Sequence, residues 1–213
     1  MKENIINTYN PTEEKLNIYS HLIGLVLSIV GLILLLTKAI PTNDWNKIVS
    51  FFVFGLSMIT LYLASTLYHN ATNPVKRMRL KIFDHISIYI LIAGSYTPFT
   101  LVSLINNNGW VVFTIVWAFA LVGLVIKLFF TGRFKLISTL MYVLMGWMIV
   151  FTWNDLKVNL STEGINWLVA GGIFYTVGAI LYSIKKIPFN HAIFHCFVLL
   201  GTFCHFISIY LYV

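Results

Sequence analysis

The stretch NHAIFHCFVLLGTFCHF, residues 190–206, carries three histidines in an otherwise apolar sequence. His191 and His195 are four residues apart, so on a helix both rings project from one face, about one turn apart. His205 follows His191 by fourteen residues, which places it on nearly the same face but roughly 20 Å further along. Two imidazoles at i and i+4 can share a metal ion, and further ligands would have to come from other segments.

Further residues able to support metal chemistry lie at the ends of other apolar stretches. His69 ends one of them, Ser65 precedes it by four residues, and Asp84 opens the next. Three neutral imidazoles leave one position of a tetrahedral Zn²⁺ open, as in catalytic zinc sites. A carboxylate beside that position, here Asp84, could accept or orient a proton of bound water. Because an ionisable group in a spanning helix costs a few kcal/mol, a site is the default hypothesis.

Other histidines have simpler explanations. Glu14, Asn17 and His21 fall within about 60° of one another on a helix and could face the same site. For His21 and His85, a hydrogen-bonding role at the membrane interface is the stronger alternative. For His205, which lies too deep to join the other histidines, hydrogen bonding between helices is favoured.

The elements that must position these residues are apolar segments of membrane-spanning length. Each contains about 17 to 25 residues, as a spanning helix requires, and short turns such as NATNPVKR and KKIPFN separate them. We expect a single domain, residues 1–213, with a short tail at 1–17 and a bundle of seven helices. The segments are Tyr19–Leu36, Ile48–Tyr68, Phe83–Ile105, Trp110–Phe130, Leu136–Trp153, Ile165–Ile184 and Ala192–Val213.

The composition excludes a soluble globular domain. Of the 213 residues, 59% are hydrophobic and only 10% are charged, whereas soluble domains carry roughly a quarter charged residues. The net charge of +7 could suggest nucleic-acid binding, but the basic residues lie in short turns and form no basic face. An all-α, multi-pass protein of the plasma membrane is predicted, with no nucleic-acid partner.

Lysine and arginine placement predicts the orientation. Eleven of the fourteen basic residues lie in the tail and in the second-to-third, fourth-to-fifth and sixth-to-seventh connections, and only Lys38, Lys47 and Lys157 lie on the opposite side. By the positive-inside rule the N-terminus is cytoplasmic and the C-terminus outside. His21, His69, Asp84, His191 and His195 then all lie near the cytoplasmic face.

Four stretches resemble the haemolysin III family, the bacterial branch of the progestin and adipoQ receptor superfamily. They are EEKLNIYSHLIG, STLYHN, FDHISIYILIAGSYTPF and NHAIFHCFVLLGTFCHF, and they extend from residue 13 to residue 206. The resemblance implies that His69, His191 and His195 hold zinc. It also implies that Asp84 contacts the zinc water and that Ser65 belongs to the site. Both are expected to be catalytic, Asp84 as general base and Ser65 as a hydrogen-bonding group or, alternatively, a nucleophile. Glu14, Asn17, Ser20 and His21 match the family's N-terminal motif and are expected to support the cytoplasmic rim.

Several functions are compatible with this reading. The first is a zinc-dependent hydrolase of lipid amide or ester bonds, because the family is related to alkaline ceramidases. The second is a non-enzymatic membrane-homeostasis or sensor protein in which zinc is structural. A cytolytic activity, which the family name suggests, and a proton-coupled transporter are less well supported by the residues.

Overall fold

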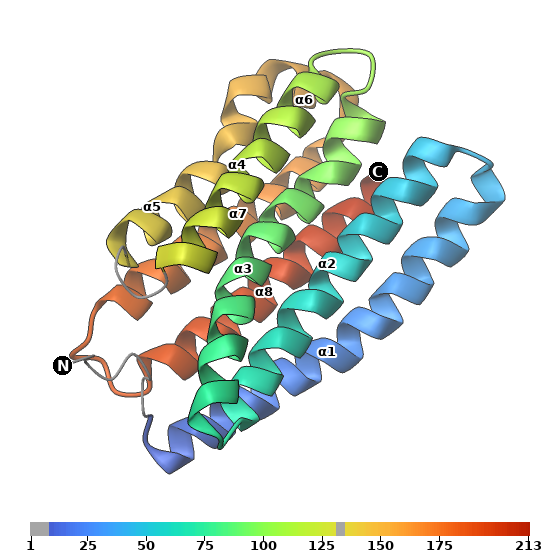
Figure 1. Cartoon of the computed structure of the whole chain (residues 1–213). Helices are drawn as coiled ribbons and strands as arrows, with labels where there is room; N and C mark the ends of the chain where they lie inside the picture. Colours follow the sequence, from blue (N-terminus) through green and yellow to red (C-terminus); the bar gives the residue numbers. More distant parts are fainter. Residues whose placement is uncertain (1–8, 131–134) are drawn as a thin grey trace.

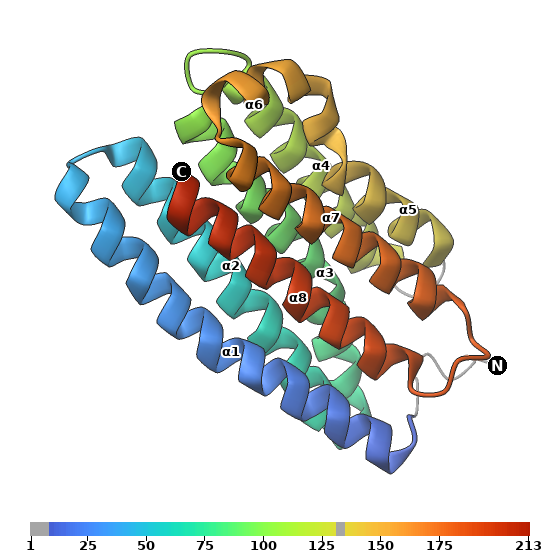
Figure 2. The ribbon, with the colours of Figure 1, turned by 180° about the vertical axis from the view of Figure 1, so that it is seen from behind.

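The computed structural model describes residues 9–130 and 135–213, and within these ranges it contains helices and no strands. The helices lie side by side in an elongated bundle (Figures 1 and 2). The α-helices are α1 (Pro11–Ala39), α2 (Trp45–Asn70), α3 (Pro74–Pro98), α4 (Gly109–Phe130), α5 (Lys135–Gly146), α6 (Trp153–Asn159), α7 (Thr162–Ser183) and α8 (Asn190–Tyr212). Three short segments join them: the 3₁₀ turns η1 (Ile40–Thr42) and η3 (Met148–Thr152) and the π-helical turn η2 (Phe99–Ser103).

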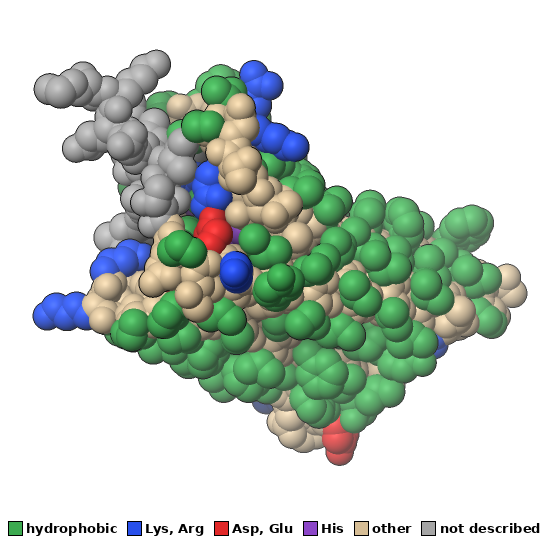
Figure 3. Space-filling model, turned by 90° about the horizontal axis from the view of Figure 1, so that it is seen from below, with side chains coloured by type: hydrophobic (Ala, Val, Ile, Leu, Met, Phe, Trp, Pro, Cys, Tyr) green, Lys and Arg blue, Asp and Glu red, His purple; other side chains and the backbone are tan. Residues whose placement is uncertain are grey.

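Seven segments of the bundle are long and apolar enough to cross a membrane, as predicted. Hydrophobic side chains cover most of the lateral surface, whereas most of the basic side chains visible in Figure 3 lie near one end. An apolar surface of this extent matches a lipid surrounding. The protein is therefore a seven-helix membrane protein. Of the basic residues used to predict its orientation, Lys2 and Arg133 lie outside the described residues.

The first helix begins earlier than its apolar segment. Asn10 accepts a hydrogen bond from the Thr12 amide at 2.8 Å, and Pro11 occupies the first turn. This combination of N-cap and proline starts a helix. Consequently Glu14 and Asn17, which fall in the expected tail at 1–17, lie on α1 together with His21, as their helical spacing required. Residues 1–8 of that tail lie outside the described part of the chain.

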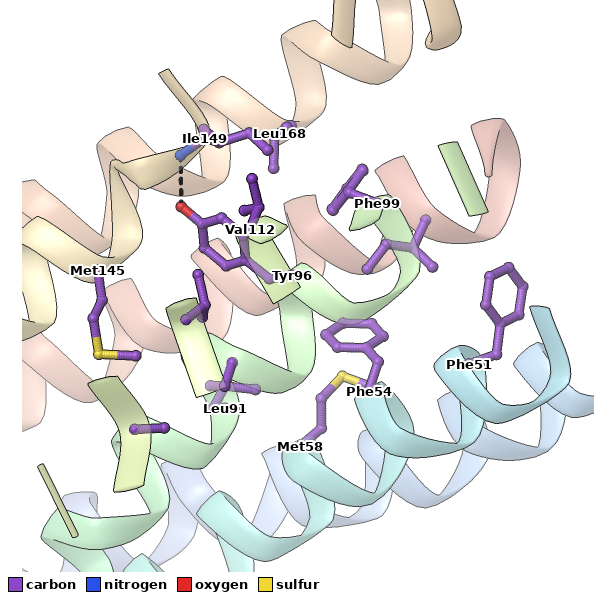
Figure 4. Packing of buried hydrophobic residues seen from close by; sticks show 14 of the residues in the cluster. Phe51, Phe54, Met58, Leu91, Tyr96, Phe99, Val112, Met145, Ile149 and Leu168 are labelled. Carbon is purple, nitrogen blue, oxygen red and sulfur yellow. Dashed lines mark hydrogen bonds between the residues drawn. The ribbon is translucent and has the colours of Figure 1, made fainter. Parts of the chain in front are cut away.

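The fifth span is a broken helix, in contrast to the continuous segment expected from the sequence. α5 ends at Gly146, and η3 and α6 continue the span to Asn159. Tyr96 of α3 donates a hydrogen bond to the Gly146 carbonyl at 2.9 Å. It accepts one from the Ile149 amide, also at 2.9 Å (Figure 4). Backbone groups freed by a break in a membrane helix must find partners within the protein. The Tyr96 hydroxyl supplies both, which stabilises the break.

The third span changes its winding at a proline. α3 ends at Pro98 and the π-helical turn η2 follows directly. Proline lacks the amide that would continue the α-helical ladder. The change lies far along α3 from Asp84, so the end of α3 that carries Asp84 remains regular α-helix.

The last helix, α8, packs against both α1 and α7. At its C-terminal end Lys38 of α1 donates to the Tyr210 carbonyl, and Lys47 of α2 donates to the Val213 carbonyl at 2.7 Å. Cations that hydrogen-bond the last carbonyls of a helix stabilise its C-terminus. These contacts hold α8 along α1 and α2, with His191 and His195 at the opposite end.

His205 has the structural role that was favoured from its position. Its Nε2 donates to the Leu168 carbonyl of α7 at 3.2 Å, and its ring contacts the edge of Tyr175. A Cβ added to Gly171 would lie 2.2 Å from the His205 ring and 3.0 Å from the Gly201 carbonyl. The contact between α7 and α8 therefore depends on a glycine at position 171.

Replacing Gly171 by alanine should destabilise the bundle. We expect Gly171→Ala to cost about 1–3 kcal/mol, as overpacking typically does, and to lower the thermal unfolding temperature in detergent. The control is the adjacent Gly172→Ala, whose Cβ would meet Trp147 at an ordinary 3.6 Å. Equal unfolding temperatures for the two variants would contradict the packing described.

Candidate metal centre

Three histidine side chains converge at one end of the bundle. His69 comes from the last turn of α2, and His191 and His195 come from the first turns of α8. The His191 Nε2 atom lies 3.0 Å from that of His69 and 3.1 Å from that of His195. All three residues are buried, and one ligand atom from each lies within 4.8 Å of the others. This group can hold a metal ion.

Glu14 of the first helix fixes the tautomer of His69. The Nδ1 atom of His69 donates a hydrogen bond to a carboxylate oxygen of Glu14 at 3.1 Å. The other oxygen of Glu14 pairs with Arg77 at the start of α3, which also donates to the backbone carbonyls of His69 and Ala71 at 3.2 and 3.1 Å. With its proton on Nδ1, a neutral His69 presents the Nε2 lone pair to the cluster.

His195 is oriented in the same way by a different group of α1. Its Nδ1 lies 3.3 Å from the Asn17 carbonyl oxygen, which can only accept a hydrogen bond. The proton of neutral His195 therefore lies on Nδ1, and the Nε2 lone pair is directed at the cluster. The Ser20 hydroxyl lies 3.3 Å from the same nitrogen. Histidines that bind a metal through one ring nitrogen characteristically donate a hydrogen bond from the other.

Two lone pairs directed at His191 Nε2 cannot both be satisfied by hydrogen bonds, since that atom carries at most one proton. A cation at the centre would satisfy all three nitrogens. With Zn–N bonds of about 2.0–2.1 Å, a tetrahedral site separates its nitrogens by about 3.3–3.4 Å. The observed separations of 3.0 and 3.1 Å are within a few tenths of an ångström of that spacing. The residues present fit a metal.

His191 is positioned through its backbone and its ring faces. Glu13 accepts a hydrogen bond from the His191 amide at 3.3 Å, and this bond caps the first turn of α8. Tyr9 stacks on the ring at a centroid distance of 4.8 Å, and Tyr182 of α7 contacts it at 5.3 Å. The buried Nδ1 has no hydrogen-bond partner within the described chain.

Asp84 and Ser65 lie together beside the histidines. Asp84 is buried, with only 9% of its surface exposed. It lies next to Ser65 and close enough to His69 and Lys81 to interact with their charges. Lys81, one turn earlier on α3, is also buried. The structure thus places the predicted acid near His69, one of the three histidines, and the predicted hydroxyl next to that acid. Their catalytic roles remain predictions.

His21 lies deeper than the expected rim. Its ring stacks on His195 with centroids 3.5 Å apart and an angle of 10°, and Tyr62 packs edge-on at 5.1 Å. Both ring nitrogens, and both polar atoms of the Asn17 side chain, are buried without a partner in the described structure. Glu14, Asn17 and His21 do share one face, as their spacing predicted. His85 instead donates to the Lys81 carbonyl at 2.6 Å within its own helix.

Sequence reasoning missed Arg77, Tyr9 and Tyr182 as parts of this site. Arg77 was used only to predict orientation, although a carboxylate near a membrane-spanning segment needs a cationic partner. The position of Glu14 at the start of a span therefore predicts a cationic partner, and Arg77 lies at the same membrane surface. Tyr9 and Tyr182 left no such signal, because aromatic residues are frequent throughout the chain: 16% of the sequence.

These features define a class: a multi-pass membrane protein with a buried three-histidine site that can hold a metal ion. The family model for "Haemolysin-III related" proteins matches residues 9–206. The match includes every residue of the site just described. The chain belongs to the haemolysin III family.

Relatives in two kingdoms align over nearly the whole chain. The chain is 45% identical to "Hemolysin-3" of Bacillus cereus over 201 residues, which cover 94% of this chain and 92% of that protein. It is 46% identical to the "Hemolysin-3 homolog" of Bacillus subtilis, with 94% of each chain covered. It is 28% identical to the human "Monocyte to macrophage differentiation factor", with 96% of this chain and 87% of that protein covered.

Removing one histidine of the cluster should remove the metal. We expect metal analysis of the purified protein to give about one ion per chain, and His191→Ala to lose it, since two imidazoles hold zinc much more weakly than three. His205→Ala, on the same helix and also buried, should keep the ion. Equal metal content in the two variants would exclude the three-histidine site.

The Glu14 carboxylate should tune affinity without being a ligand. We expect Glu14→Gln to weaken metal binding by about 10–100-fold, as loss of such a hydrogen-bond partner typically does. Competition with a chromophoric chelator measures this directly. Glu163→Gln, an exposed acid at the other end of the bundle, is the matched control, and unchanged affinity in Glu14→Gln would show that the contact does not orient His69.

Proposed function

We propose that this protein is a zinc-dependent hydrolase of amide or ester bonds in membrane lipids, with its site at the cytoplasmic leaflet. One observation supports the proposal above all: a buried carboxyl group and a hydroxyl group lie beside a three-nitrogen site. His69, His191 and His195 would hold the ion. Structural zinc sites generally have four protein ligands, whereas catalytic sites have three and keep a position open.

Zinc is the metal that suits the donor set. Three imidazole nitrogens without a thiolate or a carboxylate in the first coordination sphere are typical of catalytic zinc. When bound, such an ion supplies Lewis acidity to a carbonyl group and makes water a stronger nucleophile. The remaining chemistry falls to the side chains of the chain itself.

Asp84 is the proposed general base and acid. It lies beside the histidines, where it would accept a proton from water and return it to the leaving amine or alcohol. Ser65 would hold the Asp84 carboxyl group or the substrate carbonyl by a hydrogen bond. Glu14 and the Asn17 carbonyl would keep the two imidazoles in the required tautomer. Tyr9 and Tyr182 would limit access of bulk water to His191.

A lipid substrate follows from the position of the site. The three histidines are buried between spans, at the ends of α2 and α8 that the basic residues assign to the cytoplasmic side. A bond between a head group and an acyl chain lies at this depth, near the boundary of the hydrocarbon region. Such a linkage could reach Asp84 laterally, between helices.

Two alternatives have specific support. The cluster joins α2 to α8, and Glu14 joins it to α1, so a metal could serve stability alone in a non-enzymatic membrane-homeostasis protein. A cytolytic activity is suggested by the name "Hemolysin-3" given to the Bacillus cereus relative. Erythrocyte lysis by purified protein at low concentration would favour the latter.

Replacing Asp84 should separate catalysis from structure. In zinc-loaded protein assayed on a panel of ceramides, N-acylethanolamines and glycerolipids, we expect Asp84→Asn to lower turnover by about 10²–10⁴-fold. Metal content and unfolding temperature should change little, because amide and carboxylate have similar shapes. Ser95→Ala, a buried serine elsewhere on α3, is the control. A fully active Asp84→Asn, or no turnover by the wild type across the panel, would contradict the proposal and favour structural metal.

A further inference from the structure

A concave feature lies between α6 and α7, at the end of the bundle opposite the histidines. It is a cavity of about 440 Å³, within the usual size range of small-molecule sites. It forms where the fifth span is broken. Trp147, just after the end of α5, donates a hydrogen bond from its Nε1 to Thr176 of α7 at 2.9 Å, and α6 follows as a separate helix. The lining residues are Trp153, Lys157, Thr162, Ile165, Asn166, Val169, Ala170 and Ile173.

The polarity of the cavity changes along its length. Thr162 and Asn166 lie in the first turns of α7, together with Lys157 near the end of α6. Val169, Ala170 and Ile173 follow toward the middle of the span, and Ile173 is about 16 Å along the helix from Thr162. Because both walls belong to membrane spans, the polar end lies at a membrane surface and the apolar end in the hydrocarbon region.

Lys157 is available to an anion. Its ammonium group lies 6.0 Å from the centre of the Trp153 ring, which also lines the cavity. Asp155 and Glu163 are near in sequence, yet neither forms an ion pair with it. A lysine at a membrane surface attracts anionic lipid head groups, and tryptophan favours the same depth.

We propose that this cavity binds one anionic phospholipid from the leaflet opposite the three-histidine site. The phosphate would pair with Lys157 and accept hydrogen bonds from Thr162 and Asn166, and an acyl chain would lie along Val169, Ala170 and Ile173. The inference is independent of the hydrolase proposal, since no residue of the metal centre takes part. It assigns a regulatory or stabilising lipid, rather than a substrate, to the broken fifth span.

The test is retention of defined lipids by the purified full-length protein, measured by native mass spectrometry. Delipidated protein in detergent is titrated with phosphatidylglycerol and, separately, with phosphatidylcholine of the same chains. We expect one phosphatidylglycerol to bind in preference to phosphatidylcholine. Lys157→Gln should weaken that binding about fivefold, the effect of one lysine near a lipid surface. Ala170→Phe, which fills the apolar part, should weaken both lipids.

The control is Lys186→Gln, which removes the same charge from an exposed position at the other end of the bundle. It should bind phosphatidylglycerol as the wild type does. Circular dichroism and gel filtration show whether each variant is folded. The proposal is overturned if the wild type retains no lipid, if it does not prefer phosphatidylglycerol, or if folded Lys157→Gln binds it unchanged.

Discussion

The bridge made by the Glu14 carboxylate is the interaction on which the metal centre depends. One oxygen pairs with Arg77 and the other accepts the His69 Nδ1 proton. Three helices are thereby joined through one side chain: α1 carries the acid, α2 the imidazole and α3 the guanidinium. Arg77 compensates the charge that Glu14 brings near the hydrocarbon region, and Glu14 in turn decides which nitrogen of His69 is free. The same side chain therefore has its own partly buried charge neutralised by Arg77 and sets the protonation of the His69 ring.

The polar groups around this contact are concentrated rather than scattered. Buried polar atoms without a partner in the described structure occur on Asn17, His21, Tyr62, Ser65, Tyr68 and His191, all near the three histidines, and otherwise only on His205. Each such atom in an apolar surrounding costs several kcal/mol if it stays unpaired. A stable protein accepts that arrangement where water, an ion or a polar part of a substrate completes the hydrogen bonds. The distribution agrees with a binding site rather than with packing alone.

Much of this arrangement could be predicted from local spacing, because a helix converts residue separation into direction. The i, i+4 relation of His191 and His195, the shared face of Glu14, Asn17 and His21, and the structural role of His205 all follow from 3.6 residues per turn. The partners of these residues could not be predicted in the same way. The pairing of Arg77 with Glu14, and the stacking of His21 on His195 at 3.5 Å, depend on how separate helices pack. The break in the fifth span depends on Tyr96, about 50 residues away in the sequence.

The broken span also explains why the two ends of the bundle differ. α2 packs closely against α1 and α3, and α8 packs against α1 and α7, whereas α6 makes much lighter contacts with its neighbours. At the histidine end, two of the three nitrogen–nitrogen separations, 3.0 and 3.1 Å, lie within a few tenths of an ångström of a tetrahedral spacing, as metal binding requires. At the other end, the hydrogen bonds of Tyr96 allow α6 to leave the line of α5 without exposing backbone groups to lipid. The histidine end therefore suits chemistry, while the opening between α6 and α7 suits a lipid, whose flexible acyl chains adapt to the shape of its wall.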